Sequence, residues 1–520
     1  MAKTTYYALS PSLVIDEVDT LLKESFSLKM GHQEDSSHTF YDTFDWRLYK
    51  NGWCFFCEPG RWALETLGGE RLAEFESECV PRFSSDFPEG EHWDELAKSL
   101  EPRALLALLT VVNTTVHYTA INKKQQTVAR LVLNKQRRLA AIEPDPTVWI
   151  SLTPLKGYRR EYRQLKAVLE ESQARDVGKI HTYAFKSQGL HPRNYSTKVS
   201  VGFTAETTTE LATKTLLRHN LRIMGDNLDG IRRDLDVEYL HDFRVAIRRT
   251  RSLLAQIKGA LDPDVTRRAL SDFSWLGGVT NAVRDMDVFL LGADHFRRLL
   301  PVNYRPAIQT FLDYLSQRRM DEHKVMLRLL DGERCAELFT DWLEFLEKPE
   351  EDEARQGVHA NQAIEKRALK VIGKRFHRVI KQGLAVDGDS PDQALHDLRI
   401  QCKKLRYLLE FFASIFPKKI VKALVSKLKQ FQENLGEYND LCVQAQVLDD
   451  FTKRVLYPRG DARDELVAMG ILMGELHARK RLVRNDFTPA FLSFADKATH
   501  ALFAQLGGSK GQGSGLKSQS

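Results

Sequence analysis

The sequence predicts a protein of two parts, a mixed α+β domain over residues 1–200 followed by an all-α domain. Three observations lead to this prediction. Short β-prone runs separated by turn residues end near residue 200, long helical periods begin at about Thr207, and two segments of the helical part repeat each other 155 residues apart. A chain of 520 residues is long enough for two or three domains, each with its own core.

The first 200 residues alternate between strand-like and helix-like segments. Runs of β-branched and aromatic residues are bounded by Gly, Pro, Asn and Asp, which are typical of turns. We expect strands over residues 39–43, 53–56, 128–132 and 148–152, and helices near residues 13–23, 92–109 and 158–171. Cys54 and Cys57 form a lone CxxC inside one β-prone run, without a second Cys/His pair at zinc-site spacing. We therefore expect these cysteines to pack in a core, and we expect no metal site and no cofactor.

The helical domain is expected over residues 207–505, with two halves at 207–345 and 360–503. The acidic stretch 347–355 between the halves is typical of a solvated loop. Residues 506–520 are rich in Gly, Ser and Lys, which predicts a disordered tail.

Charge and hydropathy narrow the functional classes. No apolar run approaches the length of a membrane span, and the N-terminus lacks the pattern of a signal peptide, so we expect a cytoplasmic protein with no membrane partner. The chain has 76 Lys and Arg against 70 Asp and Glu, and residues 1–200 contain 26 of each kind. The whole positive excess of six charges therefore lies in the part that contains the repeat.

The repeat is the clearest functional signal. HDFRVAIRRTR at residues 241–251 returns as HDLRIQCKKLR at residues 396–406, and RDMDV at 284–288 returns as NDLCV at 439–443 with the same offset. The constant offset indicates an unbroken half-domain duplication. Residues at i, i+3, i+7 and i+10 share one helix face. The two predicted basic stripes are His241, Arg244, Arg248, Arg251 and His396, Arg399, Lys403, Arg406.

An apolar face opposite each stripe would let the helix pack while the basic face meets a ligand. These apolar residues are Phe243, Ile247, Thr250, Leu254, Ile257 in the first copy and Leu398, Cys402, Leu405, Leu409, Phe412 in the second. Arg suits phosphate because its planar fork donates bidentate hydrogen bonds. Two simpler interpretations are ordinary solvated helix faces, and structural bridges from the arginines to Asp285 and Asp440. The repetition of the same residue types favours a binding site for a polyanion.

Other cations could widen this surface into a groove for a long anion. They are Arg218, Arg222, Arg249, Arg367, Lys370, Lys374, Arg378 and Lys404. Single-strand nucleic-acid binders interleave aromatic platforms with such cations, whereas the aromatic residues here lie on or beside the apolar side. No nucleic-acid-binding signature, Gly-rich phosphate loop, HExxH motif or nucleophile elbow occurs. An anion with phosphates but no bases fits better, and we expect no catalytic residues in the helical part.

The repeated motifs resemble the CHAD family (conserved histidine α-helical domain). The resemblance covers about residues 207–505 and implies two pseudo-symmetric helical bundles with a basic surface that binds inorganic polyphosphate. Carried over, it implies that the eight stripe residues contact the ligand, while Asp285 and Asp440 brace the basic helices.

The N-terminal part resembles a CYTH domain, the triphosphate-tunnel fold. The matching residues are Tyr41-Asp-Thr43, Leu48, Gly52, the Arg61-Trp62 strand and Gly157. The resemblance implies an antiparallel tunnel-like barrel. The family's opening Glu-x-Glu-x-Lys strand is TTYYAL here, its Arg-x-Arg strand is Cys54-Phe-Phe-Cys57, and its late acidic strand is Ile150-Ser-Leu-Thr153. We therefore expect a degenerate, inactive tunnel domain.

The resulting hypothesis is a polyphosphate-binding protein, not an enzyme, that associates with polyphosphate stores or with polyphosphate-metabolising enzymes. Three alternatives stay open: metal-dependent triphosphate or polyphosphate hydrolysis by the N-terminal domain, non-specific nucleic-acid binding, and an adaptor that meets an acidic protein.

Overall fold

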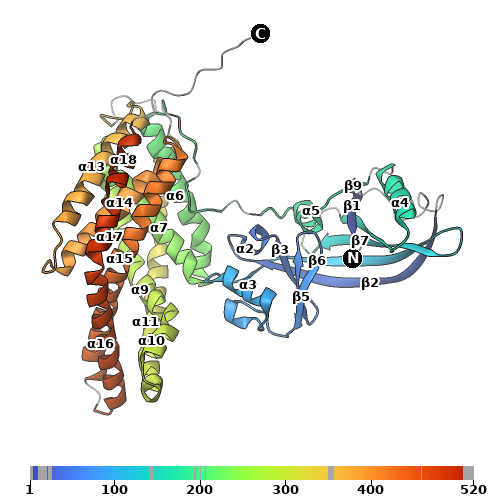
Figure 1. Ribbon diagram of the computed structural model, residues 1–520, viewed down its shortest axis with the longest axis horizontal. Helices are drawn as coiled ribbons and strands as arrows, with labels where there is room; N and C mark the ends of the chain where they lie inside the picture. Colours follow the sequence, from blue (N-terminus) through green and yellow to red (C-terminus); the bar gives the residue numbers. More distant parts are fainter. Residues whose placement is uncertain are drawn as a thin grey trace, which may run out of the picture. The chain divides into compact units, whose positions relative to one another are not determined.

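The computed structural model describes residues 4–9, 20, 26–139, 146–171, 174–192, 195–199, 201–204, 206–348, 357–457 and 460–507 (Figure 1). The chain divides into two compact units, Met1–Ser196 and Thr197–Ser520, which we call the sheet unit and the helical unit. An antiparallel sheet followed by a helical domain confirms the predicted order of fold classes. The expected helix near 13–23, most of the acidic linker and nearly all of the expected tail lie outside the described residues.

The sheet unit is built on one antiparallel sheet of nine strands in the order β5-β4-β3-β2-β6-β7-β8-β1-β9. The strands are β1 (Thr5–Leu9), β2 (Ser27–Asp42), β3 (Trp53–Glu58), β4 (Arg61–Thr66), β5 (Arg71–Glu76), β6 (Leu106–Ile121), β7 (Thr127–Arg138), β8 (Thr147–Pro154) and β9 (Arg175–Asp176). The helices are α2 (Arg47–Lys50), η1 (Ser84–Asp86), α3 (Glu91–Leu100), α4 (Arg159–Glu171) and α5 (Ile180–Ser187). The expected strands and the 158–171 helix are confirmed.

Two expectations for this unit are corrected. The tunnel-like barrel is not formed by the described residues, because β5 and β9 are the two edges of an open sheet. Three of the six residues of β5 are charged, and β9 has only two residues; both properties discourage further pairing. The helix expected over 92–109 ends at Leu100, since Pro102 disfavours helix continuation. The β-branched run that follows enters β6 instead.

The long strands have one apolar and one polar face. Leu131, Leu133, Ile150 and Leu152 pack with Leu165 of α4 in a buried cluster. Because strand side chains alternate, the other face of these strands carries polar residues. They include His38 on β2, Asn113, Thr115 and His117 on β6, Asn134 and Gln136 on β7, and Ser151 on β8.

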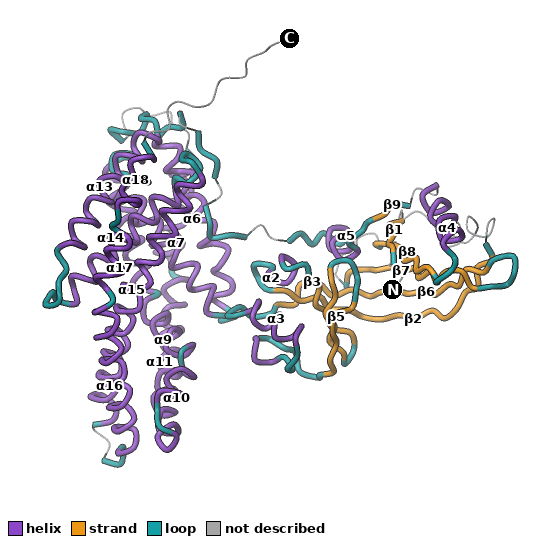
Figure 2. The backbone as a smooth tube through the Cα atoms, in the orientation of Figure 1, coloured by secondary structure: helices purple, strands orange, loops and turns teal. Residues whose placement is uncertain are grey.

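The helical unit contains long helices and no named strand among its described residues (Figure 2). Its first half comprises α6 (Thr209–Arg232), α7 (Val237–Gln256), α8 (Pro263–Val279), α9 (Asn281–Leu291), α10 (Ala293–Leu299), η2 (Val302–Ala307), α11 (Ile308–Leu330) and α12 (Glu333–Glu347). Its second half comprises α13 (Ile364–Leu384), α14 (Asp392–Phe411), α15 (Lys418–Phe451), the π-helix η4 (Thr452–Leu456), α16 (Arg463–Asn485), α17 (Phe487–Phe494) and α18 (Lys497–Gln505). None of the described helices combines the length and apolarity needed to cross a membrane.

The two halves repeat their helix boundaries. Helices α6, α7, α8 and α11 begin 155 residues before α13, α14, α15 and α16, respectively, and α7 and α14 have equal length. An antiparallel bridge joins Thr208 to Ala363, which are also 155 residues apart. The main difference is a break after Val279, where α8 gives way to α9, while α15 continues without interruption over 34 residues.

Candidate functional site

The two repeated basic segments lie on α7 and α14, which pack against each other. The side-chain amide of Gln256 on α7 donates to the carbonyl of Lys404 on α14 at 3.3 Å, and Arg249 is 3.3 Å from Glu410. All ten residues predicted for the two apolar faces are buried. Apolar packing therefore fixes the rotation of each helix about its axis, which sets where its basic residues project.

Five cations of the two stripes form what we call the cationic cluster: Arg244, Arg248, Arg399, Lys403 and Arg406. Burial is the largest cause that lowers the pKa of Lys403 to about 7, and the positive charges of its arginine neighbours add to it. These neighbours are Arg399, Arg248 and Arg406, with Asp440 opposing them. Within the described part of the chain, neither Arg248 nor Lys403 forms an ion pair or a hydrogen bond. The cluster thus holds more positive charge than the described acidic residues beside it balance.

Arg244 is anchored at the break between α8 and α9. Its guanidinium donates to the carbonyl of Gly277 at 3.2 Å and to the hydroxyl of Thr280 at 2.7 Å. A helix end leaves backbone carbonyls without intrahelical partners, so the break supplies this acceptor. Burial, followed by the charge of Arg248, lowers the pKa of Arg244 to about 10.

Acidic residues meet the cluster only at its margins. Asp440 on α15 lies 3.6 Å from the guanidinium of Arg399 and is exposed, and Glu410 lies 3.6 Å from Arg406. Burial raises the pKa of Asp285, and the positive charge of Arg244 opposes that shift. Asp285 and Asp440 therefore lie beside equivalent arginines of the two copies, and their bracing role stays a prediction.

A second group of cations continues from the cluster. Burial, then the charges of Arg375, Arg378 and Arg251, lowers the pKa of Lys404. Arg375 on α13 donates to the side-chain oxygen of Gln401 on α14. Arg375 was not among the cations predicted from the sequence, which included its neighbours Lys374 and Arg378.

The other candidate cations differ in their surroundings. Arg249 and Arg367 are buried and donate to the carbonyls of Thr197 and Lys258. Arg218 is exposed and donates to the carbonyl of Leu346 at 2.7 Å, and Arg222 lies 3.7 Å from Asp226. Lys370, Lys374 and Arg378 are exposed on α13. The buried arginines thus hold the interior of the unit together, and the three cations of α13 are open to solvent.

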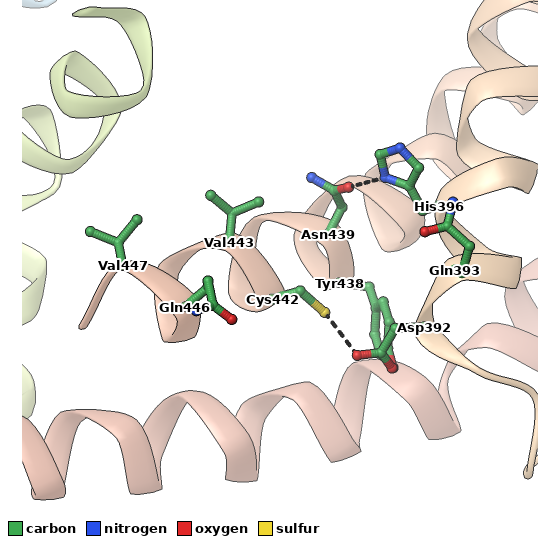
Figure 3. Close-up of a pocket in the computed structure, with 9 residues that line it drawn as sticks. All are labelled: Asp392, Gln393, His396, Tyr438, Asn439, Cys442, Val443, Gln446 and Val447. Carbon is green, nitrogen blue, oxygen red and sulfur yellow. Dashed lines mark hydrogen bonds between the residues drawn. The ribbon is translucent and has the colours of Figure 1, made fainter. Parts of the chain in front are cut away.

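The two repeat histidines are not equally exposed. His241 is half-buried, whereas His396 is exposed at the edge of a cavity of about 320 Å³ (Figure 3). Nδ1 of His396 lies 2.7 Å from the side-chain oxygen of Asn439 and donates to it. This contact leaves Nε2 of His396 available to a ligand.

The sheet unit contains a polar cavity of about 280 Å³. The sequence lacks the glutamates of the CYTH strands. Two other carboxylates, those of Glu58 at the end of β3 and Glu65 of β4, line this cavity with Arg71. Arg71 is 3.0 Å from Glu65 and 3.7 Å from Glu58, and His181 is 2.6 Å from Glu65. Burial alone would raise the pKa of Glu65, but His181 and Arg71 lower it. The charges of this cavity are therefore paired within the protein.

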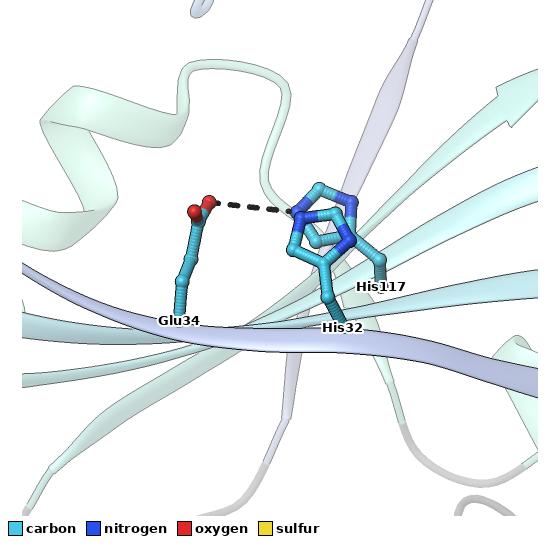
Figure 4. A group of neighbouring side chains, drawn as sticks. All are labelled: His32, Glu34 and His117. Carbon is cyan, nitrogen blue, oxygen red and sulfur yellow. Dashed lines mark ion pairs between the residues drawn. The ribbon is translucent and has the colours of Figure 1, made fainter.

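A second set of residues was also missed by the sequence analysis, which predicted no metal site. His32 and Glu34 on β2 and His117 on β6 place one possible ligand atom each within 4.8 Å of one another (Figure 4). His32-x-Glu34 is the only local signal, since residues two apart on a strand share a face. His117 joins them through strand pairing, which the spacing in the sequence does not reveal.

Comparison with known proteins bears on the helical unit. The family model described as the CHAD domain matches residues 215–449, which confirms the predicted resemblance over that range. The crystal structure of the CHAD domain from the plant Ricinus communis is similar with a TM-score of 0.48 and 21% identity, covering 57% of this chain and 95% of that chain. PptA from Streptomyces chartreusis is similar with a TM-score of 0.44 and 16% identity, and the match covers 55% of this chain and 99% of that chain. No curated protein matches the sequence. The resemblance to CYTH domains stays a prediction.

Proposed function

We propose that the helical unit binds inorganic polyphosphate through the cationic cluster on α7 and α14. The observation that carries the proposal is that Arg248 and Lys403 form no ion pair within the described residues while lying among further arginines. Like charges held together disfavour the folded state, and groups with shifted pKa values cluster at functional sites. A chain of phosphates would supply the missing negative charge through bidentate contacts to the arginines.

We further propose that the two halves are related by pseudo-two-fold symmetry. The antiparallel bridge between Thr208 and Ala363 joins equivalent positions of the repeat, as expected at a local two-fold axis. Such a site would offer similar cations to a ligand entering from either direction. Linear polyphosphate has identical units and no chain direction, so it suits a two-fold site better than a strand of nucleic acid does.

Burial of the neighbouring aromatic residues also favours polyphosphate over single-stranded nucleic acid. Tyr407 lies beneath Arg249 and Arg406, with ring centroids 5.9 and 5.7 Å from the two guanidinium carbons. Tyr407, Phe411, Phe412 and Phe243 are all buried. Bases stack on exposed rings in single-strand binders, and these four rings are already packed inside the unit.

In this proposal the protein is a binding protein whose phosphate surface brings it to polyphosphate stores or to enzymes that act on polyphosphate, in the cytoplasm. The paired charges of the sheet-unit cavity support binding without catalysis. Glu58 and Glu65 both pair with Arg71 there, and Glu65 also contacts His181, whereas hydrolysis of a triphosphate by a metal requires carboxylates free to hold the ion.

The test is a titration of long-chain polyphosphate against the full-length protein and a variant with Arg248, Arg399, Lys403 and Arg406 changed to Gln. Each lost phosphate contact removes about 0.7 from the slope of log affinity against log salt for a flexible polyanion. We therefore expect a slope lower by about 3 and an affinity lower by about 100-fold or more at moderate salt.

The matched control removes the same charge from exposed positions of the sheet unit, with Lys123, Lys124, Arg159 and Arg160 changed to Gln. We expect this variant to bind polyphosphate within about twofold of the wild type. Equal losses in both variants would show that net charge alone drives binding and would refute the assigned site. Equal affinity of the wild type for DNA, at equal phosphate concentration, would favour the nucleic-acid alternative.

A further inference from the structure

We propose that His32, Glu34 and His117 of the sheet unit bind a divalent transition-metal ion of the Zn²⁺ class. Two imidazoles and one carboxylate form one of the ligand sets that Zn²⁺ takes in proteins, with a fourth position left to water. Figure 4 shows the three side chains rising from the same face of the sheet. This inference is independent of the polyphosphate proposal, because it concerns the other unit and different residues.

The fold brings the three residues together through a β-bulge. β2 and β6 pair in an antiparallel register that shifts between Met30 and Gln33, and Glu34 lies opposite Thr115. His117 therefore faces the bulged segment. Gly31 lies so close that a Cβ built on it would be 3.3 Å from the carbonyl oxygen of His117. Bulges redirect side chains, and this one sets His32 beside His117 and keeps Glu34 on the same side.

The distances between the three side chains are close to the distances between ligand atoms around a bound metal ion. The rings of His32 and His117 are stacked with centroids 4.1 Å apart and planes 18° apart. Nε2 of His117 is 3.7 Å from the carboxylate of Glu34. Zn–N and Zn–O bonds of about 2.0–2.2 Å in a tetrahedron put ligand atoms about 3.4 Å apart. His32 and Glu34 are exposed, so side-chain rotation alone can close the remaining difference.

His117 also has an unsatisfied ring nitrogen. Its Nε2 is shielded from solvent and has no hydrogen-bond partner, since the Glu34 carboxylate is too distant for a hydrogen bond. Buried polar atoms without partners are uncommon in folded proteins. A metal ion would satisfy this atom. The imidazoles select against Ca²⁺ and Mg²⁺, which prefer oxygen ligands, and favour Zn²⁺ and its neighbours in the transition series.

The experiment is a calorimetric titration of Zn²⁺ into the full-length, chelator-treated protein in a buffer without phosphate. We expect one Zn²⁺ per chain in the wild type. His32→Ala combined with His117→Ala should weaken this binding by about 100-fold or more, and Glu34→Gln by about tenfold, because each change removes a ligand that supplies part of the binding free energy. His191→Ala, which removes an exposed histidine of the same unit, should leave the binding unchanged.

A second readout separates loss of the site from loss of the fold. The metal-free variants should have the circular dichroism spectrum and thermal midpoint of the metal-free wild type, because His32 and Glu34 are exposed and His117 is only half-buried. Zn²⁺ should raise the thermal midpoint of the wild type and of His191→Ala but not that of the double variant. A wild type that binds no Zn²⁺ at 100-micromolar concentrations (about the weakest affinity of interest), or a double variant that binds it as tightly, would overturn the proposal.

Discussion

The sheet-unit cavity and the cationic cluster both gather charged side chains, but they treat charge in opposite ways. In the cavity, Arg71 lies within 4 Å of three carboxylates, those of Glu58, Glu65 and Glu74. In the cluster, Lys403 has three arginine neighbours and only Asp440 as an acidic one. Paired charges contribute to the fold of their own unit, whereas unpaired like charges cost stability that a ligand can recover. This contrast supports the proposed assignment of polyphosphate binding to the helical unit.

The largest expected effect tests whether the charges of the cavity are structural. Glu65→Gln removes the carboxylate that Arg71 and His181 share, so we expect the sheet unit to lose about 2–4 kcal/mol of unfolding free energy. Urea unfolding followed by tryptophan fluorescence measures this, since five of the seven tryptophans lie in the sheet unit. Polyphosphate affinity should stay at the wild-type value. A variant as stable as the wild type would show that the pairing is not structural and would weaken the comparison.

A smaller effect of opposite sign is expected in the cluster. Lys403→Met removes a half-buried cation from among arginines, so the helical unit should gain about 1 kcal/mol of stability at pH 6 while polyphosphate affinity falls by about fivefold to tenfold. In the wild type the cost of this charge is complete below pH 7. The cost decreases as the pH rises from 7 toward the pKa that Lys403 has in the unfolded chain. Over this range Lys403 loses its proton in the folded state but keeps it in the unfolded state. Denaturation monitored by circular dichroism, paired with polyphosphate titration, checks both signs. Loss of stability would mean that Lys403 has a structural partner.

The third effect, no larger than that of Lys403→Met, is a pH dependence of polyphosphate binding that arises from the cationic cluster. Lys403 faces Arg248 of α7, Arg399 and Arg406 of its own helix and Asp440 of α15, and its pKa is about 7. Its protonated fraction falls from about nine-tenths at pH 6 to one-tenth at pH 8, so polyphosphate affinity should fall by up to about tenfold over this range. In Lys403→Arg the cation stays charged, and this part of the loss should vanish. Affinity is measured against pH for the wild type and for Lys403→Arg, and the difference between the two curves cancels the titration of polyphosphate itself. Parallel curves would contradict the role of Lys403.

Much of the helical unit could be predicted from local spacing. The apolar and basic stripes of 241–251 and 396–406 depend only on the 3.6-residue helical period, and the structure places the apolar stripes in the core. The spacing places Arg248 on the basic stripe and Arg249 beside it, but it does not reveal what Arg249 contacts. Arg249 became structural through the carbonyl of Thr197 and the carboxylate of Glu410. Both partners are distant in sequence, so no local pattern indicates them.

The sheet unit was less predictable because its important contacts are between strands. The strand segments could be recognised from β-branched residues and turns, but the open edges at β5 and β9 follow from pairing. The group of His32, Glu34 and His117 depends on a bulge that shifts the β2–β6 register. A shift of one residue moves a side chain to the opposite face of a sheet, so these neighbours exist only once the register is set.

By itself, the sequence determined the order of fold classes, the duplicated helical halves, the apolar faces that seat α7 and α14, and the residue types of the basic stripes. All of these follow from periodicity and from an offset of 155 residues, which are properties of the chain alone. Among the described residues, the tertiary structure alone decided which cations form no ion pair, that β5 and β9 are unpaired edges of the sheet, and that two histidines and a glutamate meet on β2 and β6. The physical reason is that pairing, burial and register depend on residues far apart in sequence, whose proximity is established only by folding.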